Sequence, residues 1–413
     1  MYGTLALSHR ALDDLADIAG QRVIDELRTL ARPIEGLRVL NLSVTGFGTG
    51  TAELLNSSVP LFADLGLDVH WEVVRASEDA ASVGRAMYQA LGGIHVAWTQ
   101  EMTDTWLRYA AMNAELLTDE FDVIIVHDPQ PLAIRSFVRT NADAKWIMHS
   151  HLDLSSAQPD VWMLLRGHAE KYDAVIFPSP SFARSDFAAR TWIVPPAIDP
   201  KSARNMPLPD ELVRTMLAQY GIDPDRPILC QIAPCDPASD LCGVVDAWQM
   251  VRRNRPDLQL VVILMTEPVD PAGRACYEEL AARCREEPSA FIVPVGRPLG
   301  NVEINVFQRA ASVIMQKGLR KGFGLWISDA LWKGRPCVVA PVCALPEQVI
   351  DGETGLFATT TEEFAAAVDR LLADPALAAK LGENGHRHVA TRFLITRYLL
   401  NYLEILNELH RIP

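Results

Sequence analysis

The feature that most constrains the fold of this chain is an alternation of short apolar runs with helical patterns, which occurs twice. In the first half, strand-like runs are expected at 37–44, 67–74, 122–127, 145–149 and 174–177, between helices at about 52–65, 81–91, 101–118, 131–140 and 159–171. In the second half, strands are expected at 228–233, 258–265, 291–295, 313–316 and 336–340, with helices at 241–254, 273–286, 301–311 and 326–332. This alternation predicts an α/β protein with two parallel, doubly wound sheets.

Pro195-Pro196 interrupts the alternation and places a hinge near residue 196. We therefore predict a first domain over 1–196 and a second over 197–395. Helices are also expected at about 8–32, 361–373, 376–390 and 396–410. The last of these carries a leucine stripe between Leu399 and Leu409 that needs a partner surface, so we assign 396–413 to the first domain.

Composition excludes several classes of protein. The 413 residues carry a formal charge of -14, whereas nucleic-acid binders and proteins of anionic membranes need a basic footprint. No apolar run approaches the ~20 residues of a membrane span, and the N-terminus lacks a signal-peptide pattern, so we expect a cytoplasmic protein. The seven cysteines are odd in number and form no Cys-x-x-Cys pair, which favours reduced, buried thiols without a metal.

Two loops that follow strands of the first half carry candidate binding residues. Gly46-Phe-Gly-Thr-Gly50 opens a helix, where backbone N–H groups can meet an anion, although a tight turn explains it equally well. His127-Asp-Pro-Gln-Pro131 stands where the ligand-binding residues of such sheets stand. Asp128 can alternatively cap a helix that begins at the prolines.

A third loop of the first half, His149–Ser156, contains two histidines, one aspartate and three hydroxyls. His149 and His151 alternate, so in an extended chain they point to opposite sides. A metal site held by both is therefore disfavoured, and we expect one of them to face the ligand. A surface loop with chance histidines is the alternative.

In the second half, Gln316–Leu325 holds Lys317, Arg320 and Lys321 among three glycines, directly before an expected helix. In an acidic chain, cations at a helix start indicate an anion site. A solvated basic loop is the alternative.

Taken together, these motifs resemble a known family. The resemblance rests on Leu65–Trp71, His127–Leu132, His151–Ser156, Pro195–Pro200, Phe307–Ala311, Gly322–Leu325, Ala330–Pro336 and Val349–Gly355. The chain is similar to the trehalose synthase branch of the retaining glycosyltransferases of family 4, which have the GT-B fold. The resemblance implies two Rossmann-like domains that face a central cleft, with the last helix crossing back to the first domain. It also implies transfer of glucose from a nucleoside-diphosphate sugar to a small sugar, with retention, no cofactor or metal, and a possible homodimer.

The resemblance also assigns residues. It places Gly48 and Gly50 near the donor phosphate and sugar, and it places Asp128, Gln130 and Asp153 on the acceptor side. His151 matches the histidine beside the transferred sugar. Gly322, Phe323, Gly324 and Leu325 match the family's donor loop, and the charge of Arg320 adds it to the donor-binding residues. The positions of the family's two glutamates are Lys321 and Asp329, and we expect these two residues and His151 to be catalytic.

Several positions depart from the family's pattern. Its diphosphate-binding Arg and Lys are replaced by Pro234 and Ser239, and a Gly-Gly pair by Cys343-Ala344. Lys321 restores one positive charge, and Lys317 adds another if the loop is helical. An active transferase with an altered donor or acceptor is therefore our first hypothesis. A pseudoenzyme that binds sugars, nucleotides or a partner protein is the second, and a phosphorolytic enzyme is the third.

Overall fold

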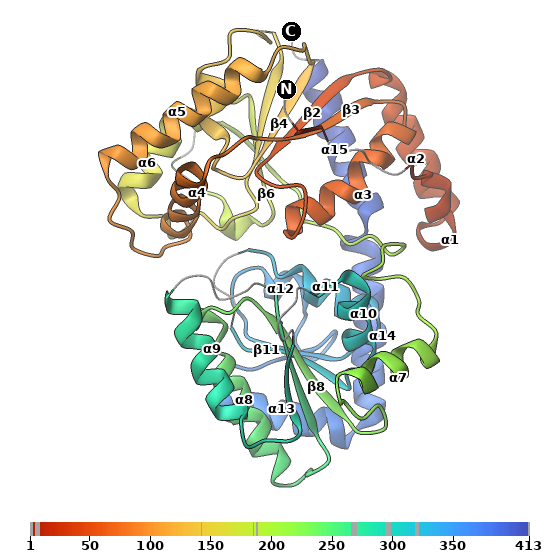
Figure 1. The fold of residues 1–413 in the computed structure, drawn as a ribbon. Coiled ribbons are helices and arrows are strands. Elements are labelled where there is room, and N and C mark those ends of the chain that lie inside the picture. The colour runs from red at the N-terminus through yellow and green to blue at the C-terminus, as the bar shows by residue number, and fades with distance from the viewer. Residues whose placement is uncertain are drawn as a thin grey trace. The chain divides into compact units, whose positions relative to one another are not determined.

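A computed structural model describes residues 9–141, 143–184, 186, 189–265, 271–293, 299–318 and 322–411, together with the backbone of 3–4. The chain divides into two compact units. Unit 1 comprises 1–197, 321–323 and 395–413, and unit 2 comprises 198–320 and 324–394. Each unit has its own sheet (Figure 1).

The sheet of unit 1 has the strand order β1-β3-β2-β4-β5-β6-β7. Its strands are β1 (Gly3–Thr4), β2 (Arg38–Ser43), β3 (Asp68–Val73), β4 (Val123–His127), β5 (Lys145–His149), β6 (Ala174–Phe177) and β7 (Arg190–Ile193). All neighbours pair in parallel except β1, which is antiparallel to β3. The parallel α/β prediction is confirmed, because β2, β4 and β5 are almost wholly buried and need helices on both faces.

The helices of unit 1 surround this sheet. They are α1 (Ala16–Ala19), α2 (Gln21–Ala31), α3 (Gly50–Asp64), α4 (Glu78–Leu91), α5 (Gln100–Leu116), α6 (Pro159–Ala169) and α15 (Ile395–His410), with 3-10 helices at Leu12–Leu15, Arg32–Ile34, Leu132–Ser136 and Pro180–Phe182. In Figure 1 the blue helix α15 lies against α2 and α3. Its leucines join a core that includes Leu27, Val39 and Ile147, so the leucine stripe packs within unit 1.

The helix expected at 131–140 is wrong in extent, because only Leu132–Ser136 form a 3-10 helix. Beyond it, the chain bonds to the loop that follows α5 instead of continuing the helix. Thr140 Oγ1 donates to the carbonyl of Leu117 (2.8 Å), and Asn141, at φ 55°, accepts from the amide of Phe121 (2.6 Å). These bonds satisfy Thr140 and Asn141 better than a further helical turn would.

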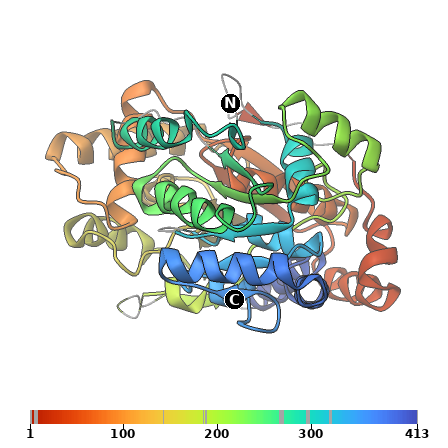
Figure 2. The ribbon, with the colours of Figure 1, turned by 90° about the horizontal axis from the view of Figure 1, so that it is seen from below.

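The sheet of unit 2 is wholly parallel, with the order β10-β9-β8-β11-β12-β13. Its strands are β8 (Ile228–Ala233), β9 (Gln259–Leu264), β10 (Ala290–Val293), β11 (Val313–Gln316), β12 (Cys337–Val339) and β13 (Leu356–Phe357). Its helices are α7 (Asp210–Gln219), α8 (Leu241–Arg252), α9 (Pro271–Cys284), α10 (Asn301–Ala310), α11 (Leu325–Trp332), α12 (Leu345–Gln348), α13 (Thr361–Ala373) and α14 (Pro375–Arg392), with a 3-10 helix at Pro237–Ser239. α8 packs on α9 and α13, while α11 packs on α14, and Figure 2 shows helices on both sides of these strands.

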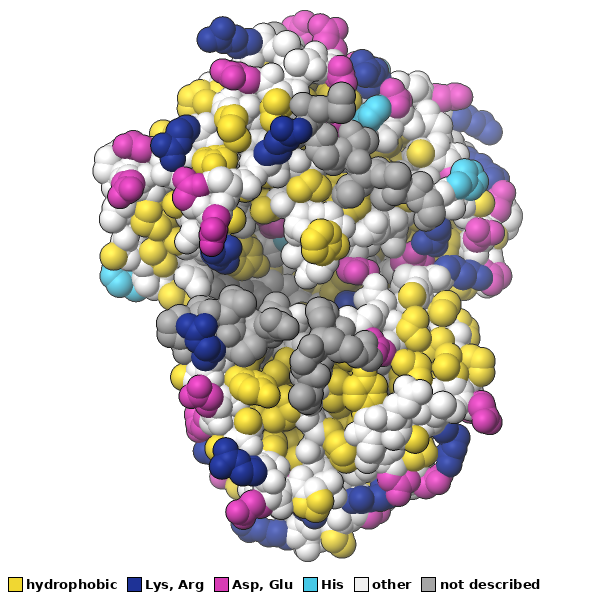
Figure 3. Space-filling model, viewed as in Figure 1, with side chains coloured by type: hydrophobic (Ala, Val, Ile, Leu, Met, Phe, Trp, Pro, Cys, Tyr) yellow, Lys and Arg dark blue, Asp and Glu magenta, His cyan; other side chains and the backbone are white. Residues whose placement is uncertain are grey.

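The surface agrees with the composition argument. On the face drawn in Figure 3, the Lys and Arg side chains of the described residues alternate with Asp and Glu rather than forming one patch. Among the described helices, none combines the length and apolarity required for a membrane crossing. The buried thiols of Cys230 and Cys337 behave as small hydrophobes, and desolvation raises the pKa of both.

Candidate active site

Three histidines meet where β4 and β5 end in unit 1. His127 and His149 are the last residues of these strands and face each other in register. Nε2 of His127 lies 3.0 Å from Asn41 Oδ1, and its Nδ1 lies 3.1 Å from Nε2 of His151. Nδ1 of His149 lies 2.5 Å from the hydroxyl of Tyr402, which α15 supplies.

The prediction that His149 and His151 point to opposite sides is wrong, because their ring centroids are 4.0 Å apart. The chain leaves the extended conformation after His149. Ser150 Oγ donates to the carbonyl of Leu152 (3.1 Å), and the amide of His151 donates to Asp128 Oδ1 (3.2 Å). This turn brings both rings to one side, so the geometric argument against a shared metal ion fails.

Asp128 organises the site rather than starting a helix. Its backbone is left-handed, with φ 67°, and its amide donates to the carbonyl of His149 (2.9 Å). Its carboxylate accepts from the His151 amide and from Thr51 Oγ1 (3.2 Å), which lies in α3. Since the following 3-10 helix is capped by Pro131, the N-cap alternative is wrong.

The three imidazoles are held neutral at pH 7. Desolvation is the largest cause, and it lowers the pKa of His127, His149 and His151 below the ordinary value. The neighbouring rings lower the pKa of His127 and His149 further, while the Asp128 carboxylate opposes the shift at His151. Neutral imidazoles offer one donor and one acceptor each, which suits hydrogen bonding to hydroxyls.

The other residues predicted for unit 1 differ in burial, hydrogen bonding and backbone conformation. The carbonyl of Gln130 accepts from Trp106 Nε1 (2.7 Å), and its side-chain Oε1 is buried without a hydrogen bond from any described residue. Asp153 Oδ1 accepts from the amide of Ser155 (2.9 Å), so it closes a local turn. Gly48 has φ 74° and Gly50 begins α3, as the Gly-rich loop predicted.

In unit 2, the loop after β8 carries the first two departures from the family's pattern. Ser239 Oγ donates to the carbonyl of Pro234 (2.9 Å), so the two positions bond to each other. Asp240 then caps α8, accepting from the amide of Gly243 (3.1 Å), and it pairs with Lys317. Lys317 therefore has a carboxylate partner within the protein, and its role as a cation for the ligand stays a prediction.

Two buried glutamines join the loops after β8 and β11. Gln231 accepts from the amide of Lys317 (3.1 Å) and donates to the carbonyl of Ser239 (3.2 Å), while Gln316 accepts from Trp326 Nε1 (2.7 Å). A Cβ on Gly318 would collide with the carbonyl of Ala238. Glycine is required here because the two loops touch.

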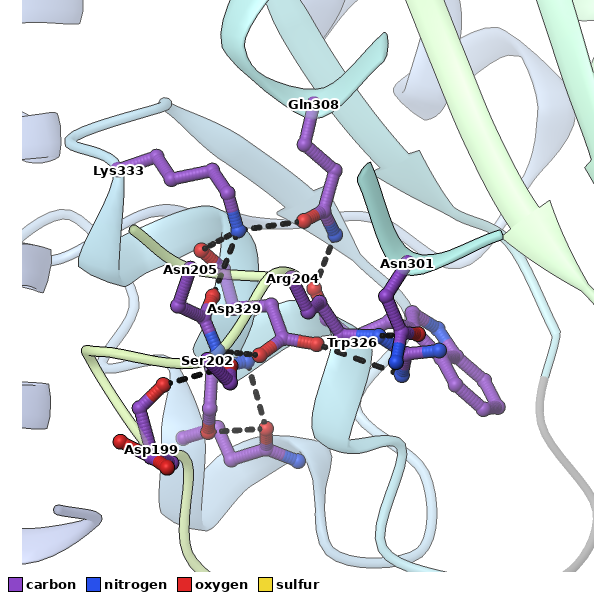
Figure 4. Close-up of polar contacts among 11 residues, drawn as sticks. Asp199, Ser202, Arg204, Asn205, Asn301, Gln308, Trp326, Asp329 and Lys333 are labelled. Carbon is purple, nitrogen blue, oxygen red and sulfur yellow. Dashed lines mark hydrogen bonds and ion pairs between the residues drawn. The ribbon is translucent and has the colours of Figure 1, made fainter. Parts of the chain in front are cut away.

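Asp329 lies in a buried polar network that the sequence did not predict (Figure 4). Its Oδ1 accepts from Asn205 Nδ2 (2.8 Å), and its Oδ2 lies 3.8 Å from Arg204 without a hydrogen bond from any described residue. Lys333 follows the last residue of α11, one helical turn after Asp329. Its Nζ donates to Asn205 Oδ1 (2.7 Å), to Gln308 Oε1 (2.8 Å) and to the carbonyl of Asp329 (3.0 Å). Burial lowers the pKa of Lys333 to about 7.

The remaining predicted donor residues lie before and at the start of α11. Arg320 and Lys321 fall outside the described residues. Gly322 and Gly324 have φ 92° and 76°, Phe323 is buried, and Leu325 is the first residue of α11. Two left-handed glycines directly before a helix let the backbone turn sharply at its N-terminus.

Comparison with known proteins agrees with this architecture. Residues 41–184 match the N-terminal domain of trehalose synthase, and residues 213–388 match the group 1 glycosyl transferases. The trehalose synthase of Rubrobacter xylanophilus is 34% identical over 406 residues, and that of Pyrococcus horikoshii is 31% identical over 403, each match covering 97% of both chains.

The chain belongs to the trehalose synthase family. As a member of this family it is a glycosyltransferase, and its fold is GT-B. The fold is also similar to an E. coli structure described as trehalose-6-phosphate bound with UDP-2-fluoro glucose. The TM-score is 0.71 and the sequence identity 16%, and the match covers 91% of this chain and 99% of the E. coli chain. The pseudoenzyme alternative gains no support, since the full-length relatives named above are synthases.

Proposed function

We propose that the protein transfers a glucosyl or related group from a nucleoside-diphosphate sugar to a small sugar acceptor, with retention. The observation that carries the proposal is the likeness to trehalose synthases over 97% of the chain. A nucleotide sugar is the donor class that this likeness implies. UDP-glucose is the first donor to test, because the similar E. coli fold was solved with a UDP-sugar.

In unit 1, we assign the acceptor to Asp128 and Gln130 and the transferred sugar to His151. The buried Oε1 of Gln130 accepts no hydrogen bond from a described residue, which supports the assignment, since a sugar hydroxyl would satisfy it. A site whose buried polar atoms need a partner rejects molecules that lack the matching hydroxyl. Neutral His151 can accept from or donate to a sugar hydroxyl, and Asp128 fixes its backbone. Gly48, Gly50 and Asp153 keep the roles that the resemblance gives them.

We assign the diphosphate to the segment 320–325, which leads into α11. The loop after β8 has Pro234 and Ser239 at the positions of the family's two cations, and its Asp240 pairs with Lys317. The charge of the leaving group must therefore be met by Arg320, Lys321 and the backbone N–H groups at the start of α11. Such fixed charges and dipoles stabilise the negative charge that develops on the diphosphate. We assign the donor ribose to Oδ2 of Asp329, which lacks a hydrogen bond from a described residue.

Calorimetric titration with UDP, ADP and GDP and their glucose conjugates tests the donor site. We expect one nucleotide to bind, Lys321→Ala to weaken it at least about tenfold, and Lys380→Ala, an exposed change in α14, to leave it unchanged. If no nucleotide binds and none is released from any conjugate, with or without acceptor, the proposal is wrong. The cytoplasmic location and the homodimer remain predictions.

A further inference from the structure

The three histidines of unit 1 form an unusually compact group of metal-ligating atoms. One ring nitrogen from each of His127, His149 and His151 lies within 4.8 Å of the other two. Across the ranges that the structure describes, no second group of three His, Cys, Asp or Glu side chains is arranged this way. His127 and His149 are buried, whereas His151 is partly exposed.

One nitrogen of this group has no hydrogen-bond partner among the residues that the structure describes. His149 is 1% exposed, and no described residue forms a hydrogen bond with its Nε2. Leaving a buried polar atom without a partner is unfavourable, so such an atom usually meets a water or an ion. When Nδ1–H of His149 donates to the Tyr402 oxygen, Nε2 carries the lone pair of this ring. The ring centroids of His127 and His151 lie 5.4 and 4.0 Å from that of His149.

The outer hydrogen bonds are those that metal-ligating histidines have. Asn41 Oδ1 accepts Nε2–H of His127, which places the His127 lone pair on Nδ1. The Tyr402 hydroxyl holds the His149 ring through Nδ1, and when it accepts from Nδ1–H it leaves the lone pair on Nε2. Partners of this kind hold a ligating ring in the right tautomer and orientation. Without an ion, one proton bridges Nδ1 of His127 and Nε2 of His151 at 3.1 Å.

We propose that His127, His149 and His151 bind one divalent transition-metal ion of the Zn²⁺ class. Imidazole nitrogens select Zn²⁺ and its late first-row neighbours over Mg²⁺ and Ca²⁺, which prefer oxygen. Two nitrogens on a tetrahedral Zn²⁺ stand ~3.3 Å apart, close to the spacing of the bridged pair. The ion replaces the bridging proton, and His151 then carries its proton on Nδ1. Asp128, at the His151 amide, partly balances the added charge.

The consequence for activity rests on the proposed function. An ion held by His151 removes from the transferred sugar the ring that we assign to it. Zn²⁺ therefore inhibits transfer, and a chelator restores it. This ion opposes the reaction, so the expectation of a metal-independent transferase is unchanged.

The test measures binding without any substrate, so its outcome does not depend on whether transfer occurs. The full-length protein, without a histidine tag and stripped by a chelator, is titrated with Zn²⁺ against a chromophoric chelator. We expect one ion per chain, a loss of at least about 100-fold in affinity for His149→Ala, and a loss of about 10–100-fold for Tyr402→Phe. His70→Gln is the matched control, because His70 pairs with Asp68 near the surface of the same unit (2.9 Å) and represents adventitious binding.

X-ray absorption of the zinc-loaded wild-type protein counts its ligands and does not depend on the folding of any variant. Three imidazoles per zinc support the proposal, and oxygen or thiolate ligands overturn it. Equal zinc affinity of the wild type and a folded His149→Ala variant would also overturn it, as would binding that His70→Gln abolishes.

Discussion

Lys333→Met tests whether the buried lysine of unit 2 is neutral in the folded protein. Nζ has three acceptors, and burial lowers its pKa from 10.5 to about 7. Arg309, Arg204 and Arg335 lower it further, while Asp329 opposes the shift. Between these two pKa values the unfolded chain holds a proton that the folded protein lacks, so the free energy of unfolding rises with pH in this window.

The size of the effect follows from the two pKa values. From pH 6 to pH 9, this one group adds about 2–3 kcal/mol to the free energy of unfolding. Below pH 7 the lysine is charged in both states, and the slope disappears. Lys333→Met leaves three acceptors unpaired, which lowers the free energy of unfolding at every pH. The neutral histidines of unit 1 also make the free energy of unfolding depend on pH, but they do so equally in every variant.

Denaturant unfolding followed by circular dichroism at pH 6, 7, 8 and 9 measures the difference in slope. We expect Lys333→Met to lack the extra rise that the wild type has, and Lys380→Met, an exposed change in the same unit, to keep it. A rise in Lys333→Met equal to that of the wild type would refute the reasoning, because Lys333 would then be charged in the fold.

Two further predictions concern the loops of unit 2. Asp240→Asn keeps the cap of α8 but removes a negative charge and frees Lys317, so we expect the KM for the donor to fall at least about threefold. Asp374→Asn, which changes the cap of α14, is the control, and an unchanged KM for Asp240→Asn would contradict the reasoning. Gly318→Ala forces the loops after β8 and β11 apart, so we expect it to lower the free energy of unfolding by about 1–3 kcal/mol. Gly167→Ala adds a methyl group in open space within α6, so it should be neutral or slightly stabilising. Equal melting temperatures for these two variants would contradict the reasoning.

The sheets and the packing of the last helix follow from local patterns, and the sequence was sufficient to predict them. Buried parallel strands read as apolar runs, and the stripe from Leu399 to Leu409 could only pack on a core. The short strands β7 and β13 have too few residues for such a pattern, and the prediction missed them. It also missed α7, although Val213, Met216 and Leu217 recur there at helical spacing.

The histidine cluster was only half visible in the sequence. His127 and His149 end strands that are neighbours in the sheet, so their contact was predictable from the register. His151 comes back beside the other two rings only because the chain turns at Ser150. Tyr402, which contacts His149, lies in a helix 253 residues further along the chain. The Lys333 network was missed because a lysine before Gly334 reads as a surface residue.

The most direct test of the account is proton NMR of the reaction of UDP-, ADP- and GDP-glucose with free glucose, in the presence of the wild type and of His151→Ala. We expect the wild type to release a nucleoside diphosphate and form an α-linked disaccharide, and folded His151→Ala to form at least about 100-fold less. A β-linked product, or equal turnover by the two proteins, would contradict a retaining transfer at His151.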